Sequence, residues 1–138
     1  MTNEFAIAVH ALIYLHHCSG TVASEVLAEN VCTNPVCIRK VMGKLKKAGI
    51  VTTKEGLNGG YHLLSDPTQL SLANVSEALK MEMVRSSWHS GSADKECMIA
   101  SGMAGILDEL VTGMNAACQE YLKTLTVADI ETKIFKNK

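Results

Sequence analysis

The stretch from Asn34 to Leu64 constrains the fold most, because a helix signal and a hairpin signal follow each other there with almost no linker. Asn34 suits the N-cap of a helix. Pro35 suits its first turn, because the N–H group that proline lacks would have no hydrogen-bond partner within the helix there. Gly49 can adopt the left-handed conformation that ends a helix. Between them, apolar residues at helical spacing predict one core-facing stripe: Ile38, Val41, Met42 and Leu45.

The opposite face of this predicted helix is basic and carries no acidic residue. It presents Val36, Arg39, Lys40, Gly43 and Lys47, with Lys46 at its edge. Residues 34–62 hold six Lys or Arg and one acid, a net charge of +5, whereas the whole chain has a net charge of −1. For an isolated helix, a solvated basic face is the ordinary explanation. The segregated charge also suits binding to phosphates.

The hairpin signal consists of two β-rich runs, Ile50–Lys54 and Tyr61–Leu64, joined by a glycine-rich tip. Asn58-Gly59 within this tip is a strong turn signal, because both residues tolerate positive φ. A slender tip can approach a phosphate backbone or a minor groove. Alone, this segment fits an ordinary surface hairpin. The basic helix before it favours a wing that binds nucleic acid.

The remaining signals predict helices around the basic helix. Residues 5–17 indicate a helix that is apolar around most of its surface, and Thr21 can cap a short second helix with Val26 and Leu27 inward. A short helix, a tight turn and a basic helix form a helix-turn-helix. Ser71 can cap a further helix. We therefore expect a mainly α fold with a small β-hairpin wing, and a winged helix-turn-helix domain over residues 1–80.

The second half of the chain predicts a loop and a dimerisation helix. Residues 81–97 form a polar, flexible, sensor-like loop, in which Trp88 either pins the loop to the body, the favoured role, or lines an effector pocket. A long helix runs from Met98 to about Leu125, and residues 126–129 open a short last helix with a capping box. Apolar steps of four and three indicate a coiled-coil-like seam that a second copy covers. The predicted interface residues are Met103, Leu107, Leu110, Met114, Cys118 and Tyr121.

Composition narrows the class of protein. At 138 residues, 47% of them hydrophobic, the chain is one domain or one domain with a dimerisation arm. The longest apolar run is too short to span a membrane and the N-terminus lacks a signal peptide, so a cytoplasmic location without membrane partners is expected. No residues have the spacing of a metal site or of a cysteine-nucleophile enzyme. We therefore predict neither a metal site nor catalysis.

Several motifs together resemble one known family. The helix-turn-helix, the segments Lys47–Val51, Gly56–Leu63 and Leu70–Val75, a cysteine-bearing loop, and a long helix ending in Leu125–Ile130 are similar to the Rrf-two family. Its members are small dimeric bacterial winged-helix transcription factors, usually repressors. The resemblance implies DNA affinity that responds to an iron–sulfur cluster, a small molecule, redox state or a partner protein.

The sequence departs from this family at two places. Glu55 stands where members often have an arginine before the wing glycine, so a minor-groove arginine contact does not carry over. Iron–sulfur members have three cysteines before the long helix, and this region has only Cys97. We therefore expect no iron–sulfur cluster and place the chain in the cluster-free branch.

The five cysteines suggest reduced thiols. Cys18 and Cys118 are predicted to be small core residues. Cys97 closes the polar loop, and Cys37 lies near the positive N-terminus of the basic helix, so these two are the candidates for an oxidant response. The expected class of effector is an oxidant or a small molecule, and the sequence leaves its identity open.

Together these features predict a homodimer that binds double-stranded DNA at a palindromic operator and represses transcription. The alternative is a winged-helix module that docks protein without binding DNA. Val36, Arg39 and Lys40 are predicted to contact base edges, and Lys44, Lys47 and Lys54 to contact phosphates. The remaining predicted DNA contacts are Asn34 and Pro35 at the helix mouth and Asn58, Gly59 and Gly60 in the wing.

Overall fold

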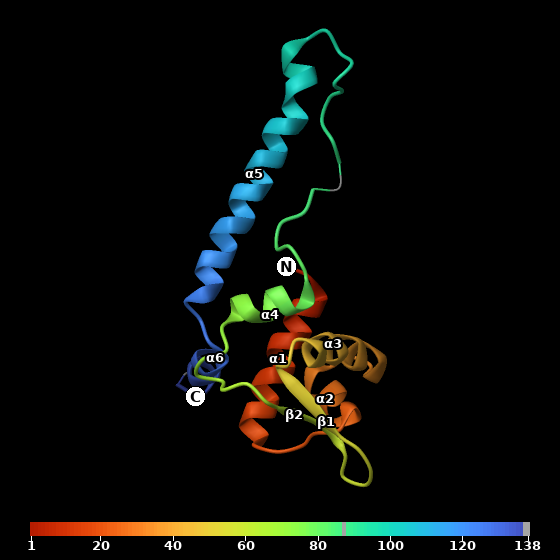
Figure 1. The fold of residues 1–138 in the computed structure, drawn as a ribbon, viewed down its shortest axis with the longest axis vertical. Helices are drawn as coiled ribbons and strands as arrows, with labels where there is room; N and C mark the ends of the chain where they lie inside the picture. The colour runs from red at the N-terminus through yellow and green to blue at the C-terminus, as the bar shows by residue number, and fades with distance from the viewer. Residues whose placement is uncertain (87, 137–138) are drawn as a thin grey trace.

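A computed structural model describes residues 1–86 and 88–136. Residue 87, part of the predicted polar loop, lies outside the described residues, as do residues 137 and 138. The fold is mainly helical with one antiparallel hairpin, as predicted (Figure 1). Its elements are α1 (Asn3–Cys18), α2 (Ser24–Val31), α3 (Pro35–Lys47), β1 (Val51–Lys54), β2 (Gly60–Leu63), α4 (Leu72–Leu79), α5 (Met98–Lys123) and α6 (Val127–Lys136).

The two ends of α3 form as the sequence predicts. The side-chain oxygen of Asn34 accepts a hydrogen bond from the Cys37 N–H at 2.9 Å, which satisfies an otherwise unpaired donor of the first turn. At the other end, Gly49 has φ 76°, and the Ile50 N–H donates to the Leu45 carbonyl at 3.0 Å. This is a Schellman motif, which directs the chain from α3 straight into the wing.

The core lies where α1, α3 and α4 meet. The predicted stripe of α3 is fully buried there, which confirms the pattern: Ile38, Val41, Met42 and Leu45. The stripe belongs to one buried cluster with Leu12 and Leu15 of α1 and with Val75 and Leu79 of α4, and α3 contacts both of these helices. The inner face of α3 is thus fixed by packing, and its outer face is left to solvent.

The second helix begins later than the sequence predicts. Thr21 does not cap it; the N-cap is Ala23, which makes no side-chain cap bond. The reason is long-range: Val22 exchanges two backbone hydrogen bonds with Tyr61 of the hairpin, each of 2.8 Å, and this extends residues 21–23. Val26, predicted to point inward, is exposed.

The wing pairs Val51 with Leu63 and Lys54 with Gly60. Asn58 has a positive φ, as predicted, with a value of 66°. Gly59 does not, but a Cβ there would lie 2.4 Å from the Lys54 carbonyl oxygen. At Gly60 a Cβ would lie 2.3 Å from the Val22 carbonyl oxygen, and φ is 152°, so a side chain there is strained in two ways. The glycines therefore keep the wing narrow and close to the body.

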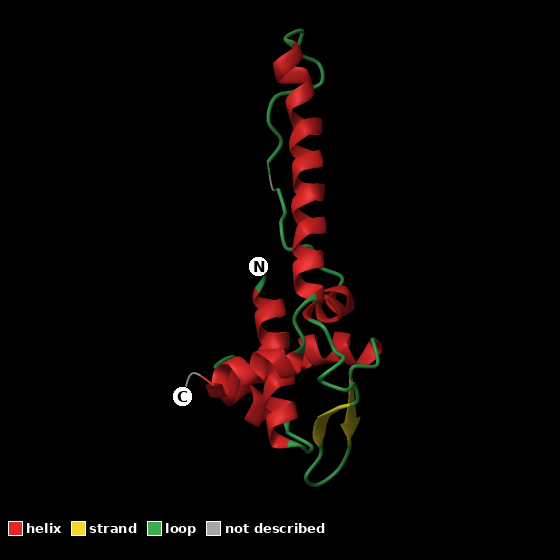
Figure 2. Ribbon diagram, turned by 90° about the vertical axis from the view of Figure 1, so that its left-hand side faces the viewer, coloured by secondary structure: helices red, strands yellow, loops and turns green. Residues whose placement is uncertain are grey.

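Helix α5 is a long rod that begins far from the body and ends at it, and the described residues between α4 and α5 run outward alongside the rod (Figures 1 and 2). Asn115 holds this segment by both its amide atoms: Oδ1 accepts from the Val84 N–H at 2.8 Å and Nδ2 donates to the Val84 carbonyl at 2.9 Å. Trp88 is 74% exposed, so its predicted role in pinning the loop is wrong.

In the part of the chain described, no helix is both long enough and apolar enough to cross a membrane.

The last helix returns to the body. The predicted capping box is confirmed, because the Thr126 N–H donates to Asp129 at 2.9 Å and the Asp129 N–H donates to Thr126 Oγ1 at 3.1 Å. Thr126 also forms a β-bridge with Ser71, and α6 packs against α1. The base of α5 is thereby tied to the winged-helix body.

Candidate nucleic-acid interface

The outer face of α3 and the wing form one continuous candidate surface. Lys46 Nζ donates a hydrogen bond to Thr53 Oγ1 at 3.0 Å, which fixes the end of the helix to the first strand. The tip of the wing projects beyond the body (Figure 1). A helix with a flanking hairpin matches the shape of a major groove and its neighbouring backbone.

Most of the predicted contact residues lie on this surface. Val36 is 65% exposed, and Arg39, Lys40, Lys47 and Lys54 are exposed as well. Asn58 is exposed at the tip, whereas Gly59, Gly60 and Pro35 are less accessible. Asn34 already uses its side-chain oxygen in the cap, so its Nδ2 group is what remains for a phosphate.

Glu4 of α1 reaches this surface, although no pattern in the sequence pointed to it. Its carboxylate lies 3.2 Å from Lys40 Nζ and 2.8 Å from Lys44 Nζ. The hydrogen bond from Lys44 is the main cause that lowers the pKa of Glu4 below its ordinary value, and Lys40 adds to it. Lys44, predicted to meet phosphate, therefore has a carboxylate partner in the free protein. Among residues 1–86 and 88–136, Arg39, Lys46, Lys47 and Lys54 form no ion pair.

We expect Glu4→Gln to tighten binding to duplex DNA, by about two- to tenfold in dilute salt, because it frees two lysines for phosphates. The measurement is a titration of labelled duplex at several salt concentrations.

The contact of Glu4 with Lys40 and Lys44 also stabilises the folded protein, but only when Glu4 is ionised. Because the pKa of Glu4 is lower in the folded protein than in the unfolded chain, this stabilisation is fully present above the unfolded-state pKa. It is lost as the pH falls through the folded-state pKa.

Glu96→Gln is the matched control, because Glu96 is exposed, makes no ion pair in the described residues, and its replacement changes the net charge equally. An equal gain in both variants would show a general charge effect and contradict a specific role for Glu4.

The cysteines differ in their exposure to solvent and in their position on the helices. Cys97 is exposed at the N-cap position of α5, where backbone hydrogen bonds from Ala100 and then Ile99 lower the pKa of its thiol. Cys37 is half-buried on α3. Cys118 is also half-buried, but Cys18, predicted as a core residue, is exposed because the last turn of α1 extends past the core.

The predicted seam of α5 is largely open to solvent in the single chain. Leu110 is 54% exposed, Met114 and Tyr121 are exposed, and Met103, Leu107 and Cys118 are half-buried. Ile106, Met98 and Ile99 add further exposed apolar side chains on the same helix. An apolar surface of this length is unusual for a chain that stays single in water.

Comparison with known proteins identifies the family. The Rrf2 family, described as iron-dependent transcriptional regulators, matches residues 1–133. The chain belongs to the Rrf2 family. The resemblance carried by the wing and the late helix is thereby confirmed, and the chain is a transcriptional regulator, not an enzyme, with DNA as its partner.

Individual relatives agree with this family. YwnA of Bacillus subtilis strain 168, assigned to the helix-turn-helix transcriptional regulators, is 29% identical over 135 residues, which cover 98% of this chain and 99% of YwnA. A crystal structure of a Lactobacillus plantarum protein, assigned as a transcriptional regulator, superposes with a TM-score of 0.81 at 29% identity and covers 97% of this chain and 91% of its own. CymR, the global cysteine regulator of B. subtilis, shares the fold, with a TM-score of 0.70, 19% identity and 96% of each chain covered.

The Rrf2 description names iron, but the described residues do not fit an iron–sulfur cluster. Cys97 is the only cysteine between α4 and α5, whereas such clusters are held by several thiolates. Within the described ranges, no three His, Cys, Asp or Glu side chains gather as metal ligands. His16 and His17 instead approach one carboxylate, that of Glu131 in α6, at 2.9 and 3.3 Å. We therefore assign no chemistry to iron here.

Proposed function

We propose that this Rrf2 protein is a homodimeric, sequence-specific DNA-binding repressor. The observation that carries the proposal is the exposed outer face of α3, where Arg39 and Lys47 have no carboxylate partner in the described residues and continue into Lys54 of the wing. Family membership supplies DNA as the partner class. Repression is the activity that the family resemblance implies.

In this proposal α3 enters the major groove of each half-site. Val36, Arg39 and Lys40 face base edges, Asn34 and Pro35 touch the backbone, and Lys44, Lys47 and Lys54 bind phosphates. Asn58, Gly59 and Gly60 follow the adjacent minor groove. Glu4 then exchanges its lysines for phosphates when DNA arrives.

The second part of the proposal is the dimer. Residues 1–80 act as the DNA-binding unit, 81–97 as the sensor-like loop, and 98–138 as the dimerisation arm. The exposed seam of α5 supports this division, because a second copy across a two-fold axis would cover it. Two copies of α3 then match a palindromic operator.

The test is the salt dependence of duplex binding by purified full-length protein. Three phosphate-binding cations per protomer, Lys44 among them once DNA displaces Glu4, predict that log K falls with log salt with a slope of about −5. Footprinting on the gene's own upstream region gives the operator, and transcription from that promoter should fall when protein is added. Retention of a partner protein with no measurable slope would instead support the alternative, a protein-docking winged helix.

A thiol response is the finer proposal for regulation. The lowered pKa and the exposure of Cys97 favour oxidation of its thiolate, and Cys97 starts the helix that would space the two copies of α3. The fold is shared with CymR, a cysteine regulator. We expect peroxide to weaken DNA binding by wild-type protein and by Cys37→Ser, but not by Cys97→Ser. Equal sensitivity in all three proteins would contradict a role for Cys97.

A further inference from the structure

Helix α3 has a different neighbour on each of its two long sides. Lys44 and Lys46 are two residues apart in sequence and therefore point about 200° apart around the helix. Lys46 donates a hydrogen bond to Thr53 of the wing, whereas Lys44 contacts Glu4 at the start of α1. Figure 1 shows the same arrangement, with α3 between the wing and the start of α1. The wing thus lies on one side of α3, and the start of α1 lies on the other.

A major groove of DNA is two-sided in the same way. It is roughly 12 Å wide, and a sugar–phosphate backbone runs along each of its edges. Contacts with these backbones fix the orientation of a helix that lies in the groove. When the wing meets one backbone, the side of α3 that carries Lys44 turns towards the other. The groups on that side therefore decide whether the second backbone is bound.

On that side of α3 lies a hollow of about 540 Å³ between the start of α1, α3 and the end of α4, which we call the α1–α4 hollow. Three cations line it: Lys44, Lys80 and Arg85. Lys44 and Lys80 also line an adjoining hollow together with Lys47. Both Lys80 and Arg85 are exposed, and neither makes an ion pair in the described part of the chain. Cations that line one hollow repel one another unless an anion lies between them, so this arrangement favours an anion.

The chain already places one anion at this hollow, the carboxylate of Glu4. It lies in the first turn of α1, where unpaired N–H groups attract negative charge, and it bridges Lys40 and Lys44 at 3.2 and 2.8 Å. Glu82 is the other acid that lines the hollow. With Lys40 counted, four cations surround two acids, so the hollow remains positive even when Glu4 is ionised. A phosphate can take over the contacts of Glu4 and still meet unpaired cations.

We propose that the α1–α4 hollow binds a DNA backbone phosphate on the edge of the major groove opposite the wing. Lys80 and Arg85 are its new cations, and Lys44 joins them when the phosphate displaces Glu4. This contact rests on the proposed DNA-binding function and adds a second phosphate-binding surface to it. With the wing on one edge and the hollow on the other, α3 is held in the groove from both sides.

The test is the salt dependence of duplex binding by the full-length protein and by the double variant Lys80→Asn/Arg85→Gln. Three phosphate-binding cations per protomer predict a slope of log K against log salt of about −5. Two more per protomer steepen the wild-type slope to about −9, because each neutralised phosphate contributes about −0.9. The double variant should return to about −5 and bind at least about 100-fold more weakly at 0.1 M salt. Asparagine suits position 80, because this C-cap residue has φ 53°, which asparagine tolerates.

Lys95→Asn/Lys136→Gln is the matched control, since it removes the same charge from two exposed positions outside both hollows. It should keep the wild-type slope. A Lys80→Asn/Arg85→Gln protein with the slope and affinity of wild type overturns the second phosphate surface and leaves the proposed function standing. An equal loss in the control overturns it as well, because the effect is then one of net charge. Absence of salt-dependent duplex binding by wild type overturns both.

Duplexes in which a methylphosphonate replaces a single phosphate then locate the contact. When the neutral group replaces the phosphate held in the hollow, wild type should bind about three- to tenfold more weakly. The double variant should bind that duplex as well as it binds the unmodified one. A scan of positions should therefore find at least one at which only wild type is weakened. If wild type and the double variant are weakened alike at every position, the hollow holds no phosphate.

Discussion

Replacing Leu110 with glutamate is expected to convert the protein from a dimer to a monomer in solution. Leu110 lies in the middle of α5 and is 54% exposed in the single chain. In the proposed dimer, two copies of the substitution would bury two carboxylates without partners, which costs several kcal/mol. The dimer should weaken at least about 100-fold, since each 1.4 kcal/mol is a factor of ten. Light scattering over a dilution series measures this change.

The same variant should lose most of its affinity for a palindromic operator, because a monomer holds only one half-site at a time. Thr112→Glu is the control: it adds the same charge at an exposed position about 200° around the helix. Unfolding monitored by circular dichroism should show that α1–α4 remain folded in both. A Leu110→Glu protein that keeps the mass of a dimer would place the interface elsewhere.

Sequence reasoning succeeded where the hydrogen-bond partners are close in the chain. The caps at Asn34 and Ser71, the turn at Gly49 and the capping box at Thr126 each involve groups within about five residues of one another. The identity of the residues therefore almost decides the geometry. Burial of the α3 stripe follows from its spacing in the same way.

Sequence reasoning failed where the structure of a residue depends on a contact with a segment distant in the chain. The start of α2 depends on a bridge between Val22 and Tyr61, and the charge state around α3 depends on Glu4, 40 residues from Lys44. No periodicity or motif links such positions, since they meet only after the core has formed. The exposure of Trp88 likewise depends on how the loop before α5 is held, which the composition of that loop does not determine.

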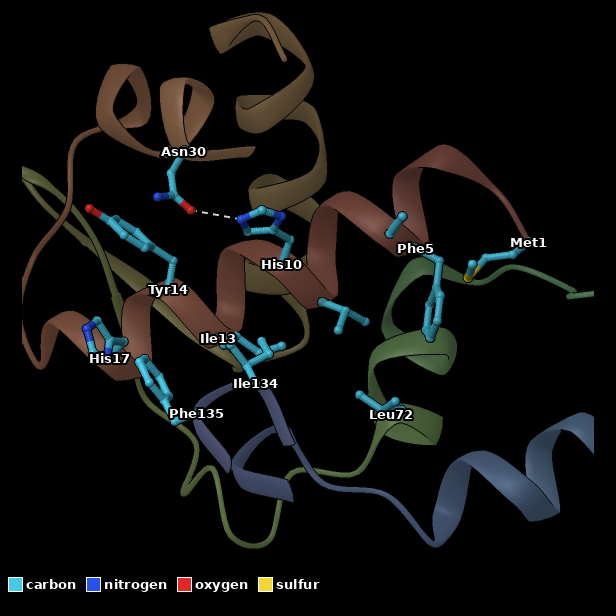
Figure 3. A pocket seen from close by; sticks show the side chains of 12 residues that line it. Met1, Phe5, His10, Ile13, Tyr14, His17, Asn30, Leu72, Ile134 and Phe135 are labelled. Carbon is cyan, nitrogen blue, oxygen red and sulfur yellow. Dashed lines mark hydrogen bonds between the residues drawn. The ribbon is translucent and has the colours of Figure 1, made fainter. Parts of the chain in front are cut away.

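The same difference, between neighbouring and distant segments, decides which features around the candidate site could be predicted. The basic face and the wing were predicted because they are contiguous in sequence. The packing of α6 on α1 was not predicted, since it stacks Phe135, near the end of the chain, on His17 (Figure 3). A contact made by α6 returning to α1 leaves no spacing to recognise in either segment.

Replacing Arg39 with alanine is expected to relax the preference for one base pair in each half-site. Arg39 is exposed on the outer face of α3 and, unlike Lys40, has no carboxylate partner among the residues described. A guanidinium that donates two hydrogen bonds to a guanine contributes about 1–3 kcal/mol of discrimination against other bases. The measurement compares Kd for the operator and for its single-base-pair variants at constant salt.

Lys47→Ala is the matched control, because an interaction with phosphate carries no sequence information. It should weaken binding to every duplex alike and make the salt slope shallower by about one for each phosphate that is no longer neutralised. If Arg39→Ala behaves in this way too, then Arg39 is a phosphate anchor. Base recognition would then fall to Val36 and Lys40, and since Lys40 is held by Glu4 in the free protein, the Glu4→Gln variant would be expected to alter sequence preference as well as affinity.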